Sequence, residues 1–326
     1  MDFKVFAPGA SREFGTKVAR ALHRQLADLE ERDFEDGEHK IRPLEEVRGA
    51  DVYVLQGLHG APDDSPNDKL CKLLFFIAAL RDHGAARVTA VVPYLAYARK
   101  DRQTKPRDPL TARYVAQLFE AVGTDRVVSM ELHNTAAFQN AFRCETLALD
   151  TRGVLLDRAV QLAGDDPVSV ASPDPGGVKR AQLFREALET RLHRPVGFAL
   201  MEKRRSAGVV TGNLLAGDVD GARVLIIDDL IASGGTMTRA AKAMLGLGAR
   251  DVWALAAHGV FTGGADTALA DPAVAGWITT DTVPPFRLSA AMADRVERVS
   301  AAPLFAKAIE RLHRNRPVLD LPAGGG

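Results

Sequence analysis

The sequence has little cysteine and no excess charge of either sign. Its 326 residues contain two cysteines, Cys71 and Cys144, which are too few for the disulfide framework of a secreted scaffold. Neither has a partner at metal-ligand spacing. Lysine plus arginine equals aspartate plus glutamate at 42 each, so no net field attracts nucleic acid or an acidic membrane.

Long apolar runs are also missing, because no apolar stretch reaches ~18 residues, the length that spans a bilayer. Residues 1–4 include the acidic Asp2 and do not begin an apolar targeting segment. Hydrophobic residues still make up 46% of the chain. A chain of this length can fill two cores, since single cores seldom grow past ~250–300 residues. We therefore expect a cytoplasmic enzyme with no membrane or nucleic-acid partner.

Short apolar runs alternate with helical patterns along the chain. Between the runs, residues 10–29 and 69–83 carry apolar side chains at three- and four-residue spacing, which favours helices. The alternation predicts an α/β protein with two mainly parallel sheets flanked by helices. The predicted strands are 4–7, 51–55, 88–93, 127–131, 168–172, 196–201, 224–227 and 252–256.

The first four predicted strands and the last four form two similar halves, each ending near a polar loop. We place the boundary near Ala148, so that residues 1–147 form an N-terminal domain and residues 148–326 a C-terminal domain. The tail 317–326 is rich in proline and glycine and is expected to fray.

The most informative segment is 224–236. It begins with the uninterrupted aliphatic run of a strand buried on both faces, and Asp228 and Asp229 follow that run. Residues 232–235 have small side chains, so their N–H groups can approach an anion, and Thr236 opens a helix whose positive end favours phosphate. Vicinal ribose hydroxyls suit the two carboxylates, because each hydroxyl can donate to a carboxylate oxygen. By itself, the pattern also fits two capping aspartates before a tight turn.

This segment resembles the phosphoribosyl-pyrophosphate loop of type I phosphoribosyltransferases and of ribose-phosphate pyrophosphokinases. In those families the acidic pair holds the ribose hydroxyls and the loop holds the 5-phosphate. The resemblance implies two type I phosphoribosyltransferase-like domains, with ribose 5-phosphate bound by the second. It assigns that role to Asp228, Asp229, Ser233, Gly234, Gly235 and Thr236.

A second polar segment, 91–109, distinguishes the two families. A predicted strand leads into five cations within nine residues, Arg99, Lys100, Arg102, Lys105 and Arg107. Such runs are usually solvated, but the carboxyl end of a strand is where open α/β sheets bind ligands, which favours polyphosphate binding. The segment resembles the Pro-Tyr-x-x-Tyr-Ala-Arg-x-Asp-Arg pattern of ribose-phosphate pyrophosphokinases, which phosphoribosyltransferases lack. This resemblance implies that Arg99, Lys100 and Asp101 bind ATP.

The resemblance covers nearly the whole chain and implies further ATP-site residues in the first domain. Phe34, Asp36 and Glu38 match a family loop that reaches the adenine of a neighbouring subunit. His133, in Glu131-Leu132-His133, matches the histidine of the family's Asp-Leu-His, which binds magnesium together with the ATP phosphates. The stretch after it, 134–142, departs from the family's glutamine-rich pattern.

Two motifs in the second domain complete the resemblance. Asp174, in the segment 172–180, matches the aspartate of Ser-Pro-Asp-x-Gly-Gly-x-x-Arg, which serves a magnesium ion and the sugar site. A helix cap is the alternative role. Lys203 and Arg205 match a lysine and an arginine on a mobile loop that closes over the reacting phosphates. Positive charge that arrives only on closure stabilises the transition state preferentially and excludes water.

Together, the matched motifs imply one reaction. ATP and ribose 5-phosphate would bind in a cleft between the halves, and the anomeric hydroxyl would attack the β-phosphorus of ATP. AMP would leave, and 5-phosphoribosyl 1-pyrophosphate would form. Phosphoryl transfer requires in-line positioning and charge neutralisation, which Mg²⁺, Arg99, Lys203 and Arg205 would supply. Because the family forms dimers and hexamers with shared nucleotide sites, the resemblance also implies a homo-oligomer.

Two departures from the family pattern leave alternatives open. Lys100 stands where most members have glutamine, and Ala232 stands where the loop usually carries a third acidic residue. Adenine phosphoribosyltransferases and a second class of ribose-phosphate pyrophosphokinases share the Ala-Ser/Thr-Gly-Gly-Thr loop. Besides an active synthetase, the sequence therefore permits a non-catalytic regulatory relative or a phosphoribosyltransferase.

Overall fold

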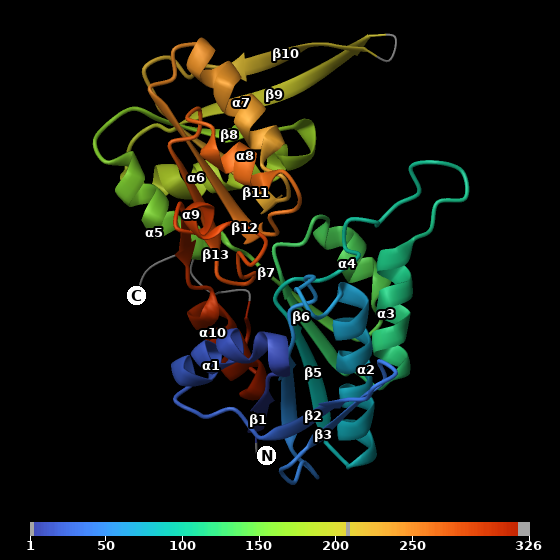
Figure 1. Ribbon diagram of the computed structural model, residues 1–326. Coiled ribbons are helices and arrows are strands. Elements are labelled where there is room, and N and C mark those ends of the chain that lie inside the picture. The colour runs from blue at the N-terminus through green and yellow to red at the C-terminus, as the bar shows by residue number, and fades with distance from the viewer. Residues whose placement is uncertain (1–2, 207–208, 319–326) are drawn as a thin grey trace. The chain divides into compact units, whose positions relative to one another are not determined.

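The structure, a computed structural model, describes residues 3–206 and 209–318, and only the backbone for residues 202–206 and 209–215. The chain divides into two compact units (Figure 1). Residues 3–150 together with 301–318 form the first unit, and the described residues between 151 and 300 form the second. No helix in the described ranges is both long enough and apolar enough to cross a membrane.

The first unit contains a five-stranded parallel sheet, with helices on both faces, and a separate two-stranded antiparallel hairpin. Its elements are β1 (Phe3–Phe6), η1 (Gly9–Ser11), α1 (Arg12–Ala21), β2 (Leu29–Asp33), β3 (His39–Pro43), β4 (Asp51–Leu55), α2 (Pro66–Asp82), β5 (Arg87–Val92), α3 (Thr111–Ala121), β6 (Arg126–Met130), α4 (Thr135–Ala141), β7 (Glu145–Leu149) and α10 (Ala302–His313). The sheet order is β1-β4-β5-β6-β7. Figure 1 shows α2 and α3 on one side of this sheet and α1 and α10 on the other.

Local chemistry explains where the elements of the first unit begin. At the start of α2, the Ser65 hydroxyl accepts a hydrogen bond from the Asp68 N–H, and the Asp68 carboxylate accepts one from the Ser65 N–H. This capping box and Pro66 at the first helical position fix the helix start. All five residues of β4 are buried, as expected for a parallel strand covered on both faces.

The second unit contains a seven-stranded sheet in the order β10-β9-β8-β11-β12-β13-β14, which is parallel except for the antiparallel pair β9-β10. Val224 and Ile226 of β11 pack with α7, whereas Leu225 and Ile227 pack with α5 and α6. Both faces of β11 are therefore buried, which explains its continuous aliphatic run. The elements are α5 (Arg152–Ala163), β8 (Val168–Ser172), η2 (Pro175–Gly177), α6 (Val178–Leu192), β9 (Gly197–Ser206), β10 (Val209–Gly217), β11 (Arg223–Ile231), α7 (Gly235–Gly246), β12 (Asp251–Gly259), α8 (Ala265–Ala270), β13 (Gly276–Thr280), α9 (Ala290–Ala293) and β14 (Val296–Val299).

The α/β class and all eight predicted strands are confirmed, but several elements were not predicted. The hairpin β2-β3 is mostly charged and largely exposed, so it lacks the apolar run on which the prediction depended. Strands β7, β10, β13 and β14 were also missed. The helix predicted over 10–29 ends at Ala21.

The last helix, α10, belongs to the first unit, although the predicted C-terminal domain of 148–326 included it. Its Phe305 ring meets the Phe14 ring of α1 edge-to-face at 5.6 Å. The His313 Nδ1 atom lies 2.8 Å from the carboxylate of the buried Asp51 in β4. The prediction was wrong at this helix because an amphipathic pattern shows that a helix buries one face, not which sheet it covers.

Candidate active site

Asp228 and Asp229 lie inside β11 rather than after its end. The strand continues to Ile231 because its backbone pairs in parallel with β12, with Ile231 opposite Gly259. The Asp229 N–H donates to Asp228 Oδ1 at 2.9 Å, and the Leu230 N–H donates to Asp229 Oδ1 at 2.9 Å. The apolar run ends at Ile227, so the sequence predicted too short a strand, although it placed both carboxylates at the carboxyl end of the sheet.

Arg180 of α6 contacts both carboxylates. Its Nη1 atom lies 3.4 Å from Asp228 Oδ1, and its Nη2 atom lies 3.8 Å from Asp229 Oδ2. Burial, and then the charge of Asp229, raises the pKa of Asp228 to about 7, against the opposing effect of Arg180. Burying the two carboxylates side by side therefore favours the protonated form of Asp228. Sequence reasoning assigned no role to Arg180, although it is the arginine of the quoted segment 172–180.

The segment that contains Asp174 lies beside these carboxylates. Strand β8 pairs in parallel with β11, with Ala171 opposite Ile226, so both strands end at the same edge. Asp174 Oδ1 accepts hydrogen bonds from the N–H groups of Gly176 at 2.8 Å and of Gly177 at 3.2 Å. A Cβ atom on Gly177 would lie 3.9 Å from Asp228 Oδ1. The two motifs that the sequence identified separately thus come together in the second unit.

The loop 232–236 connects β11 to α7. Gly234 has φ 76° and is buried, and a Cβ atom there would lie 2.9 Å from the Cβ of Ala268. Only glycine adopts this positive φ readily and also leaves room for the Ala268 side chain. Among the described residues, no side chain caps the first turn of α7, which begins at Gly235. Its first N–H groups therefore remain available to an anion, with the exposed Ser233 beside them.

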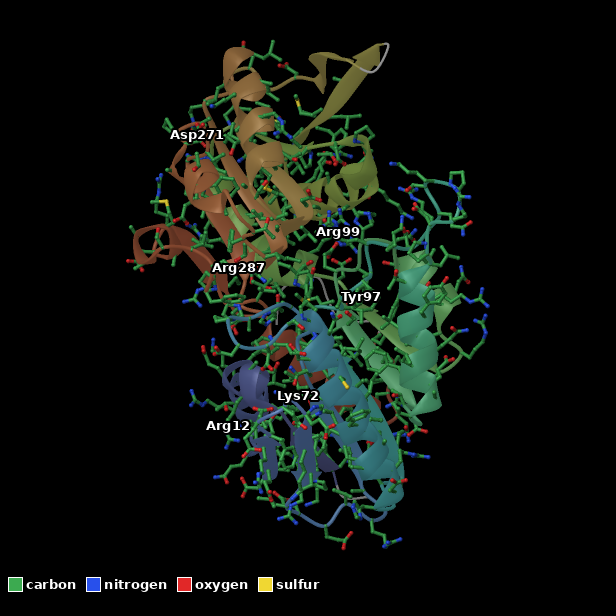
Figure 2. All side chains as sticks on the ribbon, turned by 45° about the vertical axis from the view of Figure 1, so that its right-hand side comes forward. Arg12, Lys72, Tyr97, Arg99, Asp271 and Arg287 are labelled. Carbon is green, nitrogen blue, oxygen red and sulfur yellow. The ribbon has the colours of Figure 1, made fainter. Side chains whose placement is uncertain are left out.

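In the first unit, the loop after β5 presents most of its cations to solvent. Arg99 is exposed and is labelled in Figure 2. Lys100 differs from its neighbours, because its Nζ atom lies 2.5 Å from Asp108 Oδ2. The same oxygen accepts hydrogen bonds from the Thr104 N–H at 3.1 Å and from the Thr104 hydroxyl at 2.7 Å. The hydrogen bond from Lys100, followed by the Thr104 bonds, holds the pKa of Asp108 well below its usual range.

The cations Arg99, Arg102, Lys105 and Arg107 have no ion-pair partner in the part of the chain that the structure describes. Two contacts fix the loop that carries them. Tyr97, also labelled in Figure 2, has φ 65°, and its hydroxyl donates to Asn67 Oδ1 on α2. Asn134 Nδ2 donates to Asp101 Oδ2 at 2.7 Å. The second contact joins this loop to the segment that carries the exposed His133.

The predicted adenine-site residues Phe34, Asp36 and Glu38 lie in the tight turn of the β2-β3 hairpin. The Glu38 N–H donates to Asp36 Oδ1 at 3.1 Å, and the guanidinium carbon of Arg32 lies 5.0 Å from the centre of the Phe34 ring. Among the residues that the structure describes, no hydrogen bond or ion pair joins this turn to Arg99.

Lys203 and Arg205 lie in strand β9, whereas the family resemblance implied a mobile loop there. Their backbones pair with β10 of the same hairpin, Lys203 with Asn213 and Arg205 with Val210. Their side chains lie outside the described part of the structure, so the structure does not test their catalytic roles.

No group of three or more His, Cys, Asp or Glu residues in the described ranges is arranged to hold a metal ion. This arrangement is compatible with Mg²⁺ held mainly by substrate phosphates, because Mg²⁺ usually takes only one or two protein carboxylates. Asp174 fits that role, because two backbone amides hold its side chain in place through Oδ1 and the side chain remains partly exposed.

Comparison with known proteins identifies the family. Residues 3–123 match the family model for the N-terminal domain of ribose phosphate pyrophosphokinase, and residues 211–321 match the phosphoribosyl synthetase-associated domain. Ribose-phosphate pyrophosphokinases of Caldanaerobacter subterraneus and Wolinella succinogenes are 38% and 36% identical over 321 and 320 residues, covering 98% of this chain and 98% of each relative. The chain belongs to the ribose-phosphate pyrophosphokinase family. A solved structure of this family, phosphoribosylpyrophosphate synthetase from Mycobacterium smegmatis, is 33% identical, has a TM-score of 0.86, and covers 97% of this chain and 100% of its own.

Proposed function

We propose that this protein is a ribose-phosphate diphosphokinase that converts ATP and ribose 5-phosphate into 5-phosphoribosyl 1-pyrophosphate and AMP. One observation supports the proposal most strongly. The chain is related over nearly its full length to ribose-phosphate pyrophosphokinases, and it has two carboxylates followed by a small-residue loop in one sheet and a cationic loop after a strand of the other sheet. The anomeric oxygen of the sugar forms a bond to the β-phosphorus of ATP. The bond from that phosphorus to the α–β bridging oxygen breaks, AMP leaves, and the hydroxyl proton is released.

The second unit binds ribose 5-phosphate in this proposal. The ribose hydroxyls donate to Asp228 and Asp229, which Arg180 holds in place. The 5-phosphate accepts hydrogen bonds from the loop 233–236 and lies at the positive end of α7. Hydroxyl donors favour the ionised form of a carboxylate, so sugar binding should lower the raised pKa of Asp228.

The first unit binds ATP. Arg99 and the other cations of its loop that lack ion-pair partners neutralise the phosphates, and Asp101 and His133 lie on segments joined by the Asn134 contact. Lys100 is held by Asp108, so its contribution to phosphate binding is the smallest of the loop cations. Phe34, Asp36 and Glu38 are exposed on their turn and are proposed to contact adenine in a neighbouring copy of the chain.

Mg²⁺, when bound with ATP, neutralises phosphate charge and helps to keep the attacking and leaving oxygens in line. Asp174 and His133 are the proposed protein ligands. Lys203 and Arg205 are proposed to add positive charge to the transferring group. The β9-β10 hairpin presents them on an antiparallel ribbon, and the reaction needs their charge only in the transition state.

We also propose a cytoplasmic homo-oligomer based on a dimer, because the adenine site requires residues from a second copy. Light scattering after size-exclusion chromatography measures the mass directly, and a monomer that is fully active would contradict the shared site.

A phosphorus NMR time course tests the activity. Purified protein with ATP, Mg²⁺ and ribose 5-phosphate should form AMP and 5-phosphoribosyl 1-pyrophosphate in equal amounts. Asp228→Asn should raise the KM for ribose 5-phosphate about 10-fold or more, since a neutral amide replaces a charged acceptor. If the mixture stays unchanged, the product with nucleobases is supplied next. Base consumption then identifies a phosphoribosyltransferase, and no reaction identifies a regulatory relative.

A further inference from the structure

Arg239 of α7 lies beside the loop that is proposed to bind the 5-phosphate, and no motif assigned it a role. Its side chain is exposed, and Nη2 donates to the Thr236 hydroxyl at 3.2 Å. A Cβ atom built on Gly235 would lie 3.4 Å from Arg239 Nη1 and 3.7 Å from Ser233 Oγ. The guanidinium and a loop hydroxyl therefore flank the same small space, which is open because position 235 lacks a side chain.

The charges around this space favour a dianion. Within the described residues, Arg239 makes no ion pair, so most of its five N–H donors remain available. Residues 232–236 of the loop include no acidic side chain. The nearby carboxylates of Asp228 and Asp229 lie against a different arginine, Arg180. The loop thus has a cation beside it and no acidic side chain of its own.

Lys242 provides a contrast on the same helix. It is exposed and cationic, but its Nζ atom lies 2.6 Å from Asp271 Oδ2, and Asp271 is labelled in Figure 2. Its charge is therefore already neutralised. Lys242 lies three residues after Arg239 in α7. Only the arginine faces the loop with an unpaired charge.

We propose that Arg239 is a phosphate-binding residue that gives this chain its selectivity for a phosphorylated sugar. The inference rests on the proposed function, because it takes the loop 233–236 as the 5-phosphate site. The guanidinium donates to the phosphate oxygens from the side of the loop, while the backbone N–H groups donate from the helix end. Charge-assisted hydrogen bonds of this kind are stronger than neutral ones, so the phosphate rather than the ribose ring provides most of the affinity.

The test is isothermal titration calorimetry of the whole protein with ribose 5-phosphate and with ribose, in the absence of ATP, so that binding is measured without turnover. Arg239→Gln should weaken ribose 5-phosphate binding about 10-fold, Arg239→Lys should weaken it less, and Lys242→Gln should change it less than about 2-fold. The affinity for ribose should stay unchanged in all three variants. Rising salt should reduce the difference between wild type and Arg239→Gln.

The outcomes separate this inference from the proposed activity. If the wild type forms no product but Arg239→Gln still loses ribose 5-phosphate affinity selectively, the activity is wrong and the role of Arg239 stands. If the wild type is active and Arg239→Gln binds ribose 5-phosphate within 2-fold of it, the inference is overturned. Equal losses for ribose and ribose 5-phosphate would overturn it too, because they would indicate a general disturbance of the site.

Discussion

The carboxyl ends of the two sheets differ in the charge that they present. After β5 in the first unit, four cations have no ion-pair partner in the described residues, and Lys100 is paired with Asp108. At the end of β11 in the second unit, two carboxylates share one arginine. The same parallel α/β arrangement thus supports two kinds of binding. Cations suit a polyphosphate, whereas carboxylates suit the hydroxyls of a sugar.

An arginine–aspartate ion pair lies at the amino-terminal end of each sheet, and the two pairs differ in how deeply the aspartate is buried. Arg87 holds Asp51 by two hydrogen bonds, at 2.8 and 2.5 Å, and Arg223 holds Asp251 by two, at 2.7 and 2.9 Å. The Asp51 side chain is 0% exposed and the Asp251 side chain is 23% exposed. These ends carry structural ion pairs, and the opposite ends carry the proposed chemistry.

The largest expected effect concerns this difference in burial. Arg87→Met should lower the unfolding free energy of the first unit by about 3 kcal/mol, because it leaves the buried Asp51 carboxylate with the contacts to Tyr53 and His313 but without its guanidinium partner. Arg223→Met is the variant for comparison, and it should cost the second unit about 1 kcal/mol or less, since water reaches Asp251 and Arg250 Nε also lies 3.2 Å from its carboxylate. Hydrogen exchange of the β4 and β11 amides measures the two units separately. Equal losses in the two units would contradict the role given to burial.

The next effect concerns the proposed transition-state charge. Lys203→Ala should lower kcat by about 100-fold or more, the scale of one removed transition-state donor. The family motif does not include Arg204, so Arg204→Ala is the matched control and should keep most of the activity. Steady-state kinetics and ATP binding are measured for both variants. Unchanged turnover in Lys203→Ala with intact ATP binding would exclude the proposed role.

A smaller effect distinguishes neighbouring cations of the first unit. Arg99→Gln should raise the KM for ATP about 10-fold, because it removes a charge that has no protein partner. Lys100→Gln should change that KM less than about 3-fold, since Asp108 already neutralises the lysine. The KM for ribose 5-phosphate should stay constant in both. A larger effect at Lys100 than at Arg99 would show that the Asp108 contact opens when ATP binds.

The smallest effect is a pH dependence of the second unit. The folded-state pKa of Asp228 is about 7, above the ~3.9 of an unperturbed aspartate. The folded state therefore binds the proton more tightly, and this contribution to stability is fully present below about pH 4 and is lost as the pH rises through 7. Asp228→Asn should remove this dependence, so the Tm of the variant should fall less than that of the wild type between pH 5 and pH 8. Thermal unfolding at pH 5 and pH 8 measures it, and identical pH profiles for the two proteins would contradict the raised pKa.

Much of the architecture could be predicted because parallel strands have a distinctive sequence. Strand β4 at 51–55 and strand β8 at 168–172 were predicted to the residue, since buried strands require continuous apolar runs. The hairpin β2-β3 has no such run, and its strands form by pairing with each other. The predicted strand 224–227 ended too early, because backbone pairing with β12 extends β11 past its apolar residues to Ile231.

The sequence by itself determined the α/β class, the family resemblance, and the position of the polar motifs after buried strands, because these depend on residues that are close together in the chain. Only the tertiary structure decided that α10 packs on the first unit, that Arg180 contacts both Asp228 and Asp229, and that Lys100 is neutralised by Asp108. Each of these contacts depends on which side chains packing brings within reach. Local periodicity carries no information about that choice, since the same apolar face or the same charge can find a partner on several elements.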